Sequence, residues 1–68
     1  MSMLEYCKII LQKVSFDPKL FRTELFKAFR ELVIEEFETL KKWCIETFGI
    51  SYCRKAAPEY IFNNSGLS

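Results

Sequence analysis

The chain has 68 residues, of which half are apolar and 28% are charged, and its formal net charge is +1. This composition indicates one small globular domain and excludes an intrinsically disordered chain. Charged residues interrupt every apolar stretch well before about 18 residues, the length that a membrane-spanning helix needs, so the sequence predicts no membrane span.

The residue types that most catalytic and metal sites require are scarce. The chain contains no histidine, and its three cysteines, Cys7, Cys44 and Cys53, are far apart and form no Cys-x-x-Cys pair. A catalytic nucleophile needs a neighbouring base, and a structural zinc site needs a set of four nitrogen or sulfur ligands. No glycine-rich phosphate-binding loop is present either. We therefore expect a protein that is not an enzyme, with no catalytic residues, no cofactor, no bound metal and no small-molecule substrate.

The cysteines also bear on the compartment. They are odd in number and widely spaced, and the N-terminus has no basic segment followed by an apolar one, so the pattern is not that of a secreted disulfide framework. We expect reduced thiols and, with them, a cytoplasmic location. Cys7 and Cys44 fall on apolar helical stripes and are expected in the core. Cys53, beside Arg54 and Lys55, is interpreted as a cysteine of the C-terminal tail.

The first predicted helix covers residues 2–14. Its apolar residues recur at spacings of four, three and four, which is the signature of one helical face: Met3, Cys7, Ile10 and Val14. Ser2 stands at the N-cap position, with Glu5 three residues later, and this spacing matches a capping box.

The second helix is predicted to begin at Asp17-Pro18. An aspartate at the N-cap accepts hydrogen bonds from the first free N–H groups, and a proline at the first helical position loses no hydrogen bond. We therefore interpret Asp17 as a capping residue and not as a catalytic one. Phe16 and Phe21 have the spacing of a hydrophobic staple across this start. The apolar stripe of this helix consists of Phe21, Leu25, Ala28 and Leu32.

A break is expected between Val33 and Glu35, although no glycine or proline stands between Lys19 and Phe48. A second apolar stripe follows the first and consists of Val33, Phe37, Leu40, Cys44 and Phe48. At about 100° per residue this stripe is rotated by roughly 120° from the first, which is more than the drift of a coiled coil over the same length. One straight helix could not turn both stripes toward one core, so the sequence predicts helices at 18–33 and 35–48.

The third helix is predicted to end at Gly49. A glycine in the left-handed conformation after the C-cap would bring Ile45 and Ile50 into contact. The residues that follow show no helical period and include Pro58. Residues 50–68 are therefore predicted to form a loosely ordered tail, with a short structured piece around residues 60–62.

Together these expectations describe an all-α fold: a small three-helix bundle over residues 1–49, followed by a loosely ordered C-terminal tail over residues 50–68. The predicted core consists of Cys7, Ile10, Leu11, Phe21, Leu25, Phe29, Leu32, Phe37, Leu40 and Cys44. A domain this small buries only a limited core, and small scaffolds commonly gain stability from a disulfide, a metal or a partner. Because the sequence predicts neither a disulfide framework nor a metal site, a partner is the one of these three supports that it leaves possible.

Several large apolar or aromatic residues lie off the stripes and are candidates for binding a partner. Ile9 faces away from the stripe of its helix, Phe26 is rotated by about 120° from the centre of its own, and Trp43 lies at the edge of the third. Aromatic residues among arginines are typical of interface hot spots. The candidate partner-binding residues are Ile9, Arg22, Phe26, Arg30, Trp43, Tyr60 and Phe62. Packing across helix edges within the bundle is the alternative explanation for Ile9, Phe26 and Trp43.

The charges are unevenly distributed along the chain. Residues 8–30 contain six cationic and two acidic residues, a formal charge of +4, whereas residues 31–46 contain five acidic and two cationic residues, a formal charge of −3. The basic helix at 18–33 could contact nucleic-acid phosphates, but a helix-turn-helix reader would need a basic helix after it, and here that helix is acidic. We therefore expect a small cytoplasmic protein-interaction module, self-associating or a subunit of a larger assembly, with weak backbone-reading nucleic-acid binding as the alternative.

Overall fold

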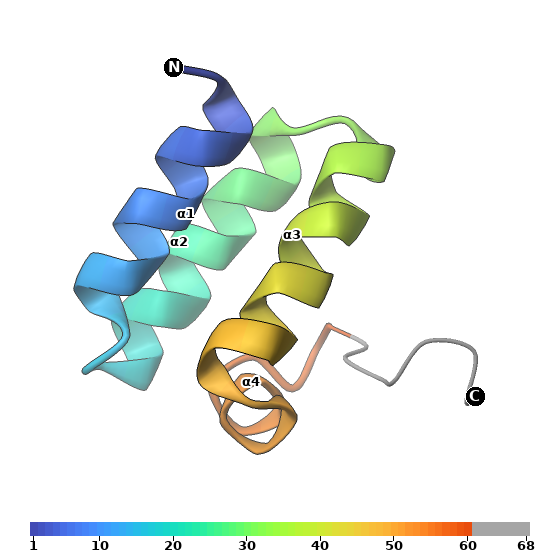
Figure 1. Ribbon diagram of the computed structural model, residues 1–68. Helices are drawn as coiled ribbons and strands as arrows, with labels where there is room; N and C mark the ends of the chain where they lie inside the picture. Colours follow the sequence, from blue (N-terminus) through green and yellow to red (C-terminus); the bar gives the residue numbers. More distant parts are fainter. Residues whose placement is uncertain (61–68) are drawn as a thin grey trace.

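The computed structural model describes residues 1–60. Within them the chain forms four α-helices: α1 (Met3–Val14), α2 (Pro18–Glu31), α3 (Ile34–Phe48) and α4 (Ile50–Ala56). The first three helices run alongside one another, and the short α4 lies across the end of α3 (Figure 1). The predicted all-helical class is confirmed, but the described chain has four helices where three were expected. None of these helices has the length and hydrophobicity to cross a membrane.

Both predicted N-caps of the first two helices are confirmed. The Ser2 hydroxyl accepts a hydrogen bond from the backbone N–H of Glu5 at 3.1 Å. The Asp17 carboxylate accepts from the N–H of Lys19 at 2.9 Å and from that of Leu20 at 3.4 Å. Phe16, however, is 78% exposed, so it contributes little packing at this turn and the expected hydrophobic staple is not formed.

The predicted break between the second and third helices is confirmed, but it begins at Leu32, one residue before the predicted range. Leu32 has φ −93° and ψ 150°, and Val33 has φ −70° and ψ 159°, so two consecutive residues are extended and the chain turns a corner between α2 and α3. Leu32 is buried at this corner, whereas Val33 and the following Ile34 are exposed. The rotation of the apolar stripe is thus achieved by two extended residues without a glycine or proline.

The prediction of a loosely ordered tail is wrong for residues 50–56, which form α4. Gly49 has a positive φ of 90°, as expected, but its ψ of 145° is extended and not left-handed helical, so the chain leaves α3 and enters α4 at once. The buried residues of α4 and its C-cap are small: Cys53, Ala56 and Ala57. Their spacing of three and one fits a helical face, but such small side chains give a weak apolar signal in the sequence.

The core lies between all four helices. Of the predicted core residues, Ile10 is only partly buried and Phe29 is 47% exposed, and the remainder are buried. Phe21 is fully buried, and its ring contacts Phe48 and Tyr52 edge-on at centroid distances of 5.3 and 5.2 Å. The Tyr52 hydroxyl donates a hydrogen bond to the Ser15 carbonyl at 2.5 Å, which ties α4 to the turn between α1 and α2. This end of the bundle is therefore held by both aromatic packing and a polar contact.

Candidate partner-binding groove

A groove of about 490 Å³ opens beside α2, where the chain passes after α4. Three of its residues are aromatic, two are charged and one carries a hydroxyl: Phe26, Phe29, Tyr60, Arg22, Glu59 and Thr23. We call it the aromatic groove. Phe26 and Phe29 are 49% and 47% exposed, so the fold leaves about half of each ring accessible to a ligand or partner.

The helical period of α2 explains why this groove is aromatic. Phe21 and Leu25 point into the core. Phe26 and Phe29 lie on the adjoining flank of the helix, because they are rotated by more than about 45° from the buried stripe. Phe29 contacts the buried Phe37 of α3 edge-on at a centroid distance of 5.1 Å. The wall of the groove is therefore anchored to the core on its inner side.

Tyr60 completes the aromatic wall from a distant part of the chain. Its ring lies 5.9 Å from Phe29 and 5.7 Å from Phe37, measured between ring centroids. The Tyr60 backbone N–H donates to the Ala57 carbonyl at 3.1 Å, which turns the chain back toward α2 after α4. Burial is the main cause that raises the pKa of the Tyr60 phenol, so the side chain is neutral at physiological pH. The groove thus has uncharged aromatic walls.

An ion pair closes one edge of the aromatic groove. Arg22 Nε donates to Glu59 Oε2 at 2.6 Å, and Arg22 Nη2 contacts the same oxygen. The pKa of Glu59 is lowered, first by a hydrogen bond from its own backbone N–H and then by the hydrogen bond and charge of Arg22. Both side chains are about half exposed. Surface ion pairs of this kind contribute little to stability, so the contact mainly orients the two side chains at the edge of the groove.

Cations surround Phe26 on the outer side of α2. The Arg30 guanidinium lies over the Phe26 ring, 5.9 Å from its centroid, and has no carboxylate partner within residues 1–60. Lys19 lies seven residues before Phe26 and therefore on the same side of the helix. The carboxylate of Glu24 belongs to the other side, where it pairs with Lys27 at 3.3 Å. The flank of α2 beside the groove is thus basic and aromatic.

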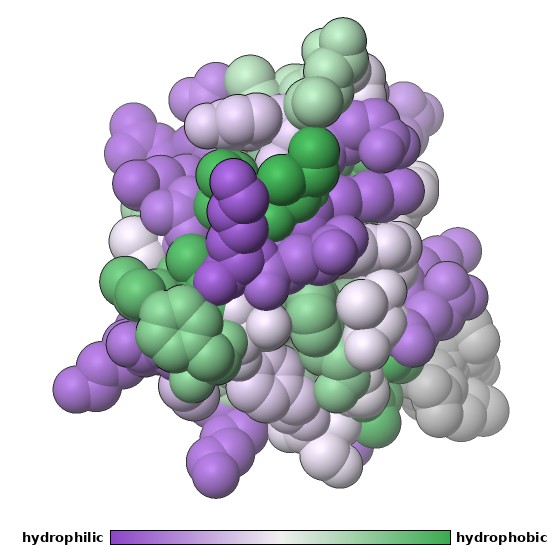
Figure 2. Space-filling model, turned by 60° about the vertical axis from the view of Figure 1, so that its left-hand side comes forward, coloured by the Kyte–Doolittle hydropathy of each residue, from purple (hydrophilic) through white to green (hydrophobic). Residues whose placement is uncertain are grey.

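A second groove, of about 460 Å³, lies between α1 and α2. Its floor is apolar, with Met3, Cys7 and Ile10 from α1, but the ion pair of Glu24 and Lys27 crosses its edge. Figure 2 shows the side of the molecule that carries α1, where hydrophilic side chains cover most of the face and hydrophobic ones appear between them. Arg30 and Glu31 also line it, and of its described lining residues one is aromatic, Tyr6, against three at the aromatic groove, so it is the weaker candidate for a binding surface.

The structure brings together only part of the predicted partner-binding set. Arg22, Phe26 and Tyr60 line the aromatic groove, although they are up to 38 positions apart in the sequence. Arg30 lies over the Phe26 ring beside it and lines the second groove, between α1 and α2. Ile9 is 37% exposed on α1, away from the groove. Phe62 lies outside the described residues.

Trp43 lies elsewhere, in the contact between α1 and α3. Its ring is partly buried and meets Phe48 edge-on at a centroid distance of 5.4 Å, while the Lys8 ammonium lies 5.8 Å from its centroid. The alternative interpretation from the sequence, packing across helix edges within the bundle, describes this residue in the structure.

Three groove residues were not recognised from the sequence: Thr23, Phe29 and Glu59. Phe29 was assigned to the core because it borders the buried stripe, but its position three residues after Phe26 was a usable signal that both rings share one flank. Glu59 and Thr23 carry no such signal, because the contact of Arg22 with Glu59 depends on the unexpected helix α4.

The three thiols are free and buried, and they add no reactive group to the surface. The pKa of Cys44 is raised well above its ordinary value, first because its thiol is hydrogen-bonded to Cys53 and then because it is buried. A protonated, inaccessible thiol is a poor nucleophile. Within residues 1–60, no three cysteine, aspartate or glutamate side chains lie close enough together to hold a metal ion.

Comparison of the chain with models of protein families, with curated proteins and with solved structures gives no match.

Proposed function

We propose that this chain is a small non-enzymatic protein-interaction module, self-associating or a subunit of a larger assembly, and that the aromatic groove is its binding surface. The observation that carries the proposal is the half-exposure of Phe26 and Phe29 on a wall that is anchored to the core through Phe37. Rigid aromatic side chains with arginine beside them are the residue types that dominate binding energy at interfaces. They bury a large area at little cost in conformational entropy.

The small size of the domain supports the same proposal. The described chain buries its core chiefly with twelve side chains, three of which are cysteines and three alanines. A core of this size stabilises a fold only modestly, so burial of further apolar surface against a partner would add to the stability of the folded state. The three free thiols fit a reducing compartment, and we therefore propose that this interaction takes place in the cytoplasm.

Site-specific photo-crosslinking in cells tests the proposed surface. A photo-reactive phenylalanine analogue placed at Thr23, which lines the groove, should give a crosslinked protein band, and the same analogue at Lys13 on α1 should not. Adding Phe26→Ala should remove the band from the Thr23 position. Equal crosslinking from both positions, or crosslinking at Thr23 that survives Phe26→Ala, would show that the groove is not the binding surface.

Weak binding to nucleic acid through α2 is the second candidate, because Lys19, Arg22 and Arg30 surround an exposed aromatic ring. Titration with a single-stranded oligonucleotide at several salt concentrations separates the two candidates. Binding to phosphates releases counterions, so its affinity falls steeply as salt increases, whereas a protein contact built on aromatic burial changes much less. Steeply salt-dependent binding that Phe26→Ala and Arg30→Ala both weaken would favour this second candidate.

A further inference from the structure

The corner between α2 and α3 exposes apolar residues that the fold does not use. Val33 is 60% exposed and Ile34 is 71% exposed, and both follow the buried Leu32. Val33 occupies the N-cap position of α3, where its side chain makes no capping hydrogen bond. Serine, threonine, aspartate and asparagine are strongly preferred at an N-cap, so valine at this position does not serve the helix. Val33 thus stands on the extended corner and Ile34 at the first position of α3, and both side chains are left for a partner to cover.

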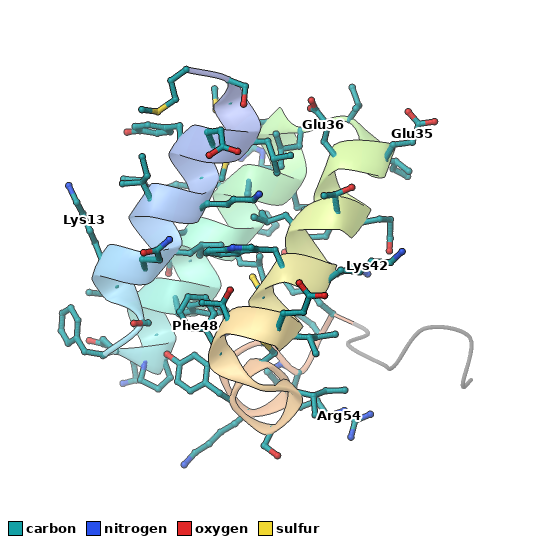
Figure 3. The ribbon with its side chains drawn as sticks, in the orientation of Figure 1. Lys13, Glu35, Glu36, Lys42, Phe48 and Arg54 are labelled. Atoms are coloured by element: carbon teal, nitrogen blue, oxygen red, sulfur yellow. The ribbon has the colours of Figure 1, made fainter. Side chains whose placement is uncertain are left out.

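Two carboxylates follow directly on the apolar pair. Glu35 and Glu36 are exposed in the first turn of α3, and neither has an ion-pair partner within residues 1–60. Figure 3 shows both side chains pointing away from the bundle at the start of α3. Glu38, one turn further on, instead pairs with Lys41 at 3.3 Å. We call the four residues Val33, Ile34, Glu35 and Glu36 the acidic corner.

The acidic corner and the aromatic groove are complementary in chemistry. The groove offers half-exposed rings of Phe26 and Phe29, and the corner offers two exposed aliphatic side chains. The groove and its basic flank carry Lys19, Arg22 and Arg30 against Glu59, a formal charge of +2, and the corner carries two glutamates, a charge of −2. Complementary charges of this kind orient two surfaces and suppress wrong pairings.

We propose that a second copy of this chain occupies the aromatic groove with its acidic corner, an inference that rests on the function proposed above. Val33 and Ile34 of one copy lie against Phe26 and Phe29 of the other, and the two glutamates face Arg30 and Lys19. Because each copy carries both surfaces, a twofold arrangement makes the same contact twice and closes the pair. Of the two forms of the module proposed above, self-association is thus favoured over membership of a larger assembly of different proteins.

The details of the groove favour this occupant over a nucleic acid. The Arg30 guanidinium lies over the ring of Phe26, so that face is not open for a base to stack on. Arg22 at the edge of the groove is already paired with Glu59, so it offers no free guanidinium to a phosphate. Aliphatic side chains need neither a free ring face nor a cation, and they gain from contact with the edges of the rings.

The first test is the mass of the full chain in solution as a function of concentration. Sedimentation equilibrium should show the mass rising from 8.1 kDa toward twice that value as the concentration increases toward about 1 mM, the weak end of specific association. Arg30→Glu should weaken this association by about tenfold or more, because it puts a carboxylate opposite the acidic corner. Lys13→Glu makes the same change of charge on α1 and should leave the association unchanged (Figure 3).

The second test exchanges the charges between the two surfaces. Lys19→Glu with Arg30→Glu makes the groove acidic, and Glu35→Lys with Glu36→Lys makes the corner basic. Each double variant alone should remain monomeric, because both of its contacts join like charges. An equimolar mixture should form a mixed pair, since both contacts then join opposite charges, and this recovery shows that neither variant failed through misfolding.

A wild-type chain that stays monomeric at every concentration overturns the inference, and so does association that Lys13→Glu weakens as much as Arg30→Glu. Failure of the two charge variants to recover association on mixing also overturns it, provided that both show helical circular dichroism. If the wild-type chain stays monomeric while the photo-reactive group at Thr23 still captures another protein, the inference fails and the proposed function stands. If self-association is found but the crosslink at Thr23 is insensitive to Phe26→Ala, the contact lies elsewhere on the surface and both fail.

Discussion

The two ends of α2 are built in opposite ways. At its start, Asp17 accepts hydrogen bonds from two backbone N–H groups, and the first core residue, Phe21, lies between two further aromatic rings. At its end, the chain turns through Leu32 and Val33, and the next helix begins without a side-chain cap. Val33 and Ile34 are exposed there, whereas at the other end Tyr52 donates to the backbone of the turn. Apart from Phe16, which is 78% exposed before the start of α2, the first end is held by contacts within the fold, whereas the second leaves apolar and charged groups for a contact outside the chain.

This difference separates two kinds of large apolar residue on the same helix. Phe21 is fully buried, whereas Phe26, five positions later, is 49% exposed beneath a guanidinium. Their sequence neighbourhoods are similar, and only their positions around the helix differ. Substitutions at the start of α2 should therefore reduce stability, and substitutions of the exposed residues in its second half and at the corner should change binding instead.

The largest expected effect is the contrast between the two phenylalanines. Phe21→Ala removes a buried ring and two edge-on aromatic contacts and should lower the free energy of unfolding by about 3–5 kcal/mol. Phe26→Ala should lower it by no more than about 1 kcal/mol, because half of that ring is already in water. Urea denaturation followed by circular dichroism measures both. Similar losses for the two variants would contradict the assignment of Phe21 to folding and of Phe26 to binding.

A smaller loss is expected at the N-cap of α2. Asp17→Ala leaves the N–H groups of Lys19 and Leu20 without their acceptor and should lower the free energy of unfolding by about 1 kcal/mol. Asp17→Asn is the matched control, because asparagine is an equally good capping residue. Thermal or urea denaturation at neutral pH separates the two variants. A loss as large in Asp17→Asn as in Asp17→Ala would show that the carboxylate acts by its charge and not as a cap.

The contact between α4 and the turn predicts a dependence on pH. Burial raises the pKa of the Tyr52 phenol above its ordinary value of 10.0, with the charge of Asp17 as a second cause. Because the folded chain holds this proton more tightly than the unfolded chain, the stabilisation is present below pH 10 and is lost as the pH rises through the folded pKa. Tyr52→Phe should remove part of this alkaline loss and should cost about 1 kcal/mol at neutral pH through the lost hydrogen bond.

Unfolding of the wild-type chain and of Tyr52→Phe at pH 7 and pH 10.5 checks this expectation. Tyr6→Phe serves as the control, since the Tyr6 ring is 53% exposed on α1. Cys44, whose pKa is also raised, contributes to the alkaline loss in all three proteins, so the comparison depends on the difference between the variants. An identical alkaline loss in the wild type and in Tyr52→Phe would exclude the hydroxyl of Tyr52 as a source of it.

Much of the fold could be predicted because its signals are local. The caps at Ser2 and Asp17 follow from residue type and spacing, and the corner at Leu32 and Val33 follows from the rotation between two apolar stripes. α4 was missed because its buried face is made of small residues and because Gly49 appeared to end the helical region. The predicted number of helices was therefore wrong because the buried side chains of α4 are small and only weakly hydrophobic.

The candidate site could be predicted only in part, since it joins distant segments. Arg22, Phe26 and Arg30 were recognised from their position on one helix, but the wall that Tyr60 forms with Phe29 exists only because α4 turns the chain back. The sequence placed Val33 on a buried stripe, where its spacing to Phe37 is regular. Extended backbone at the corner turned it outward, and helical periodicity cannot anticipate such a change.

The smallest expected effect on stability is also the sharpest comparison of the two ends of α2. Val33→Ser supplies the missing N-cap of α3 and should raise the free energy of unfolding by about 0.5–1 kcal/mol, a change of opposite sign to that of Asp17→Ala. The same substitution removes an apolar side chain from the acidic corner and should weaken self-association. Urea denaturation at low concentration and sedimentation equilibrium at high concentration measure the two effects separately. A variant that is more stable as a monomer but associates less would show that valine at this position serves a contact between chains, because no defect in folding could produce both results. A variant that is less stable, or that associates as well as the wild type, would show that Val33 contributes only to the fold.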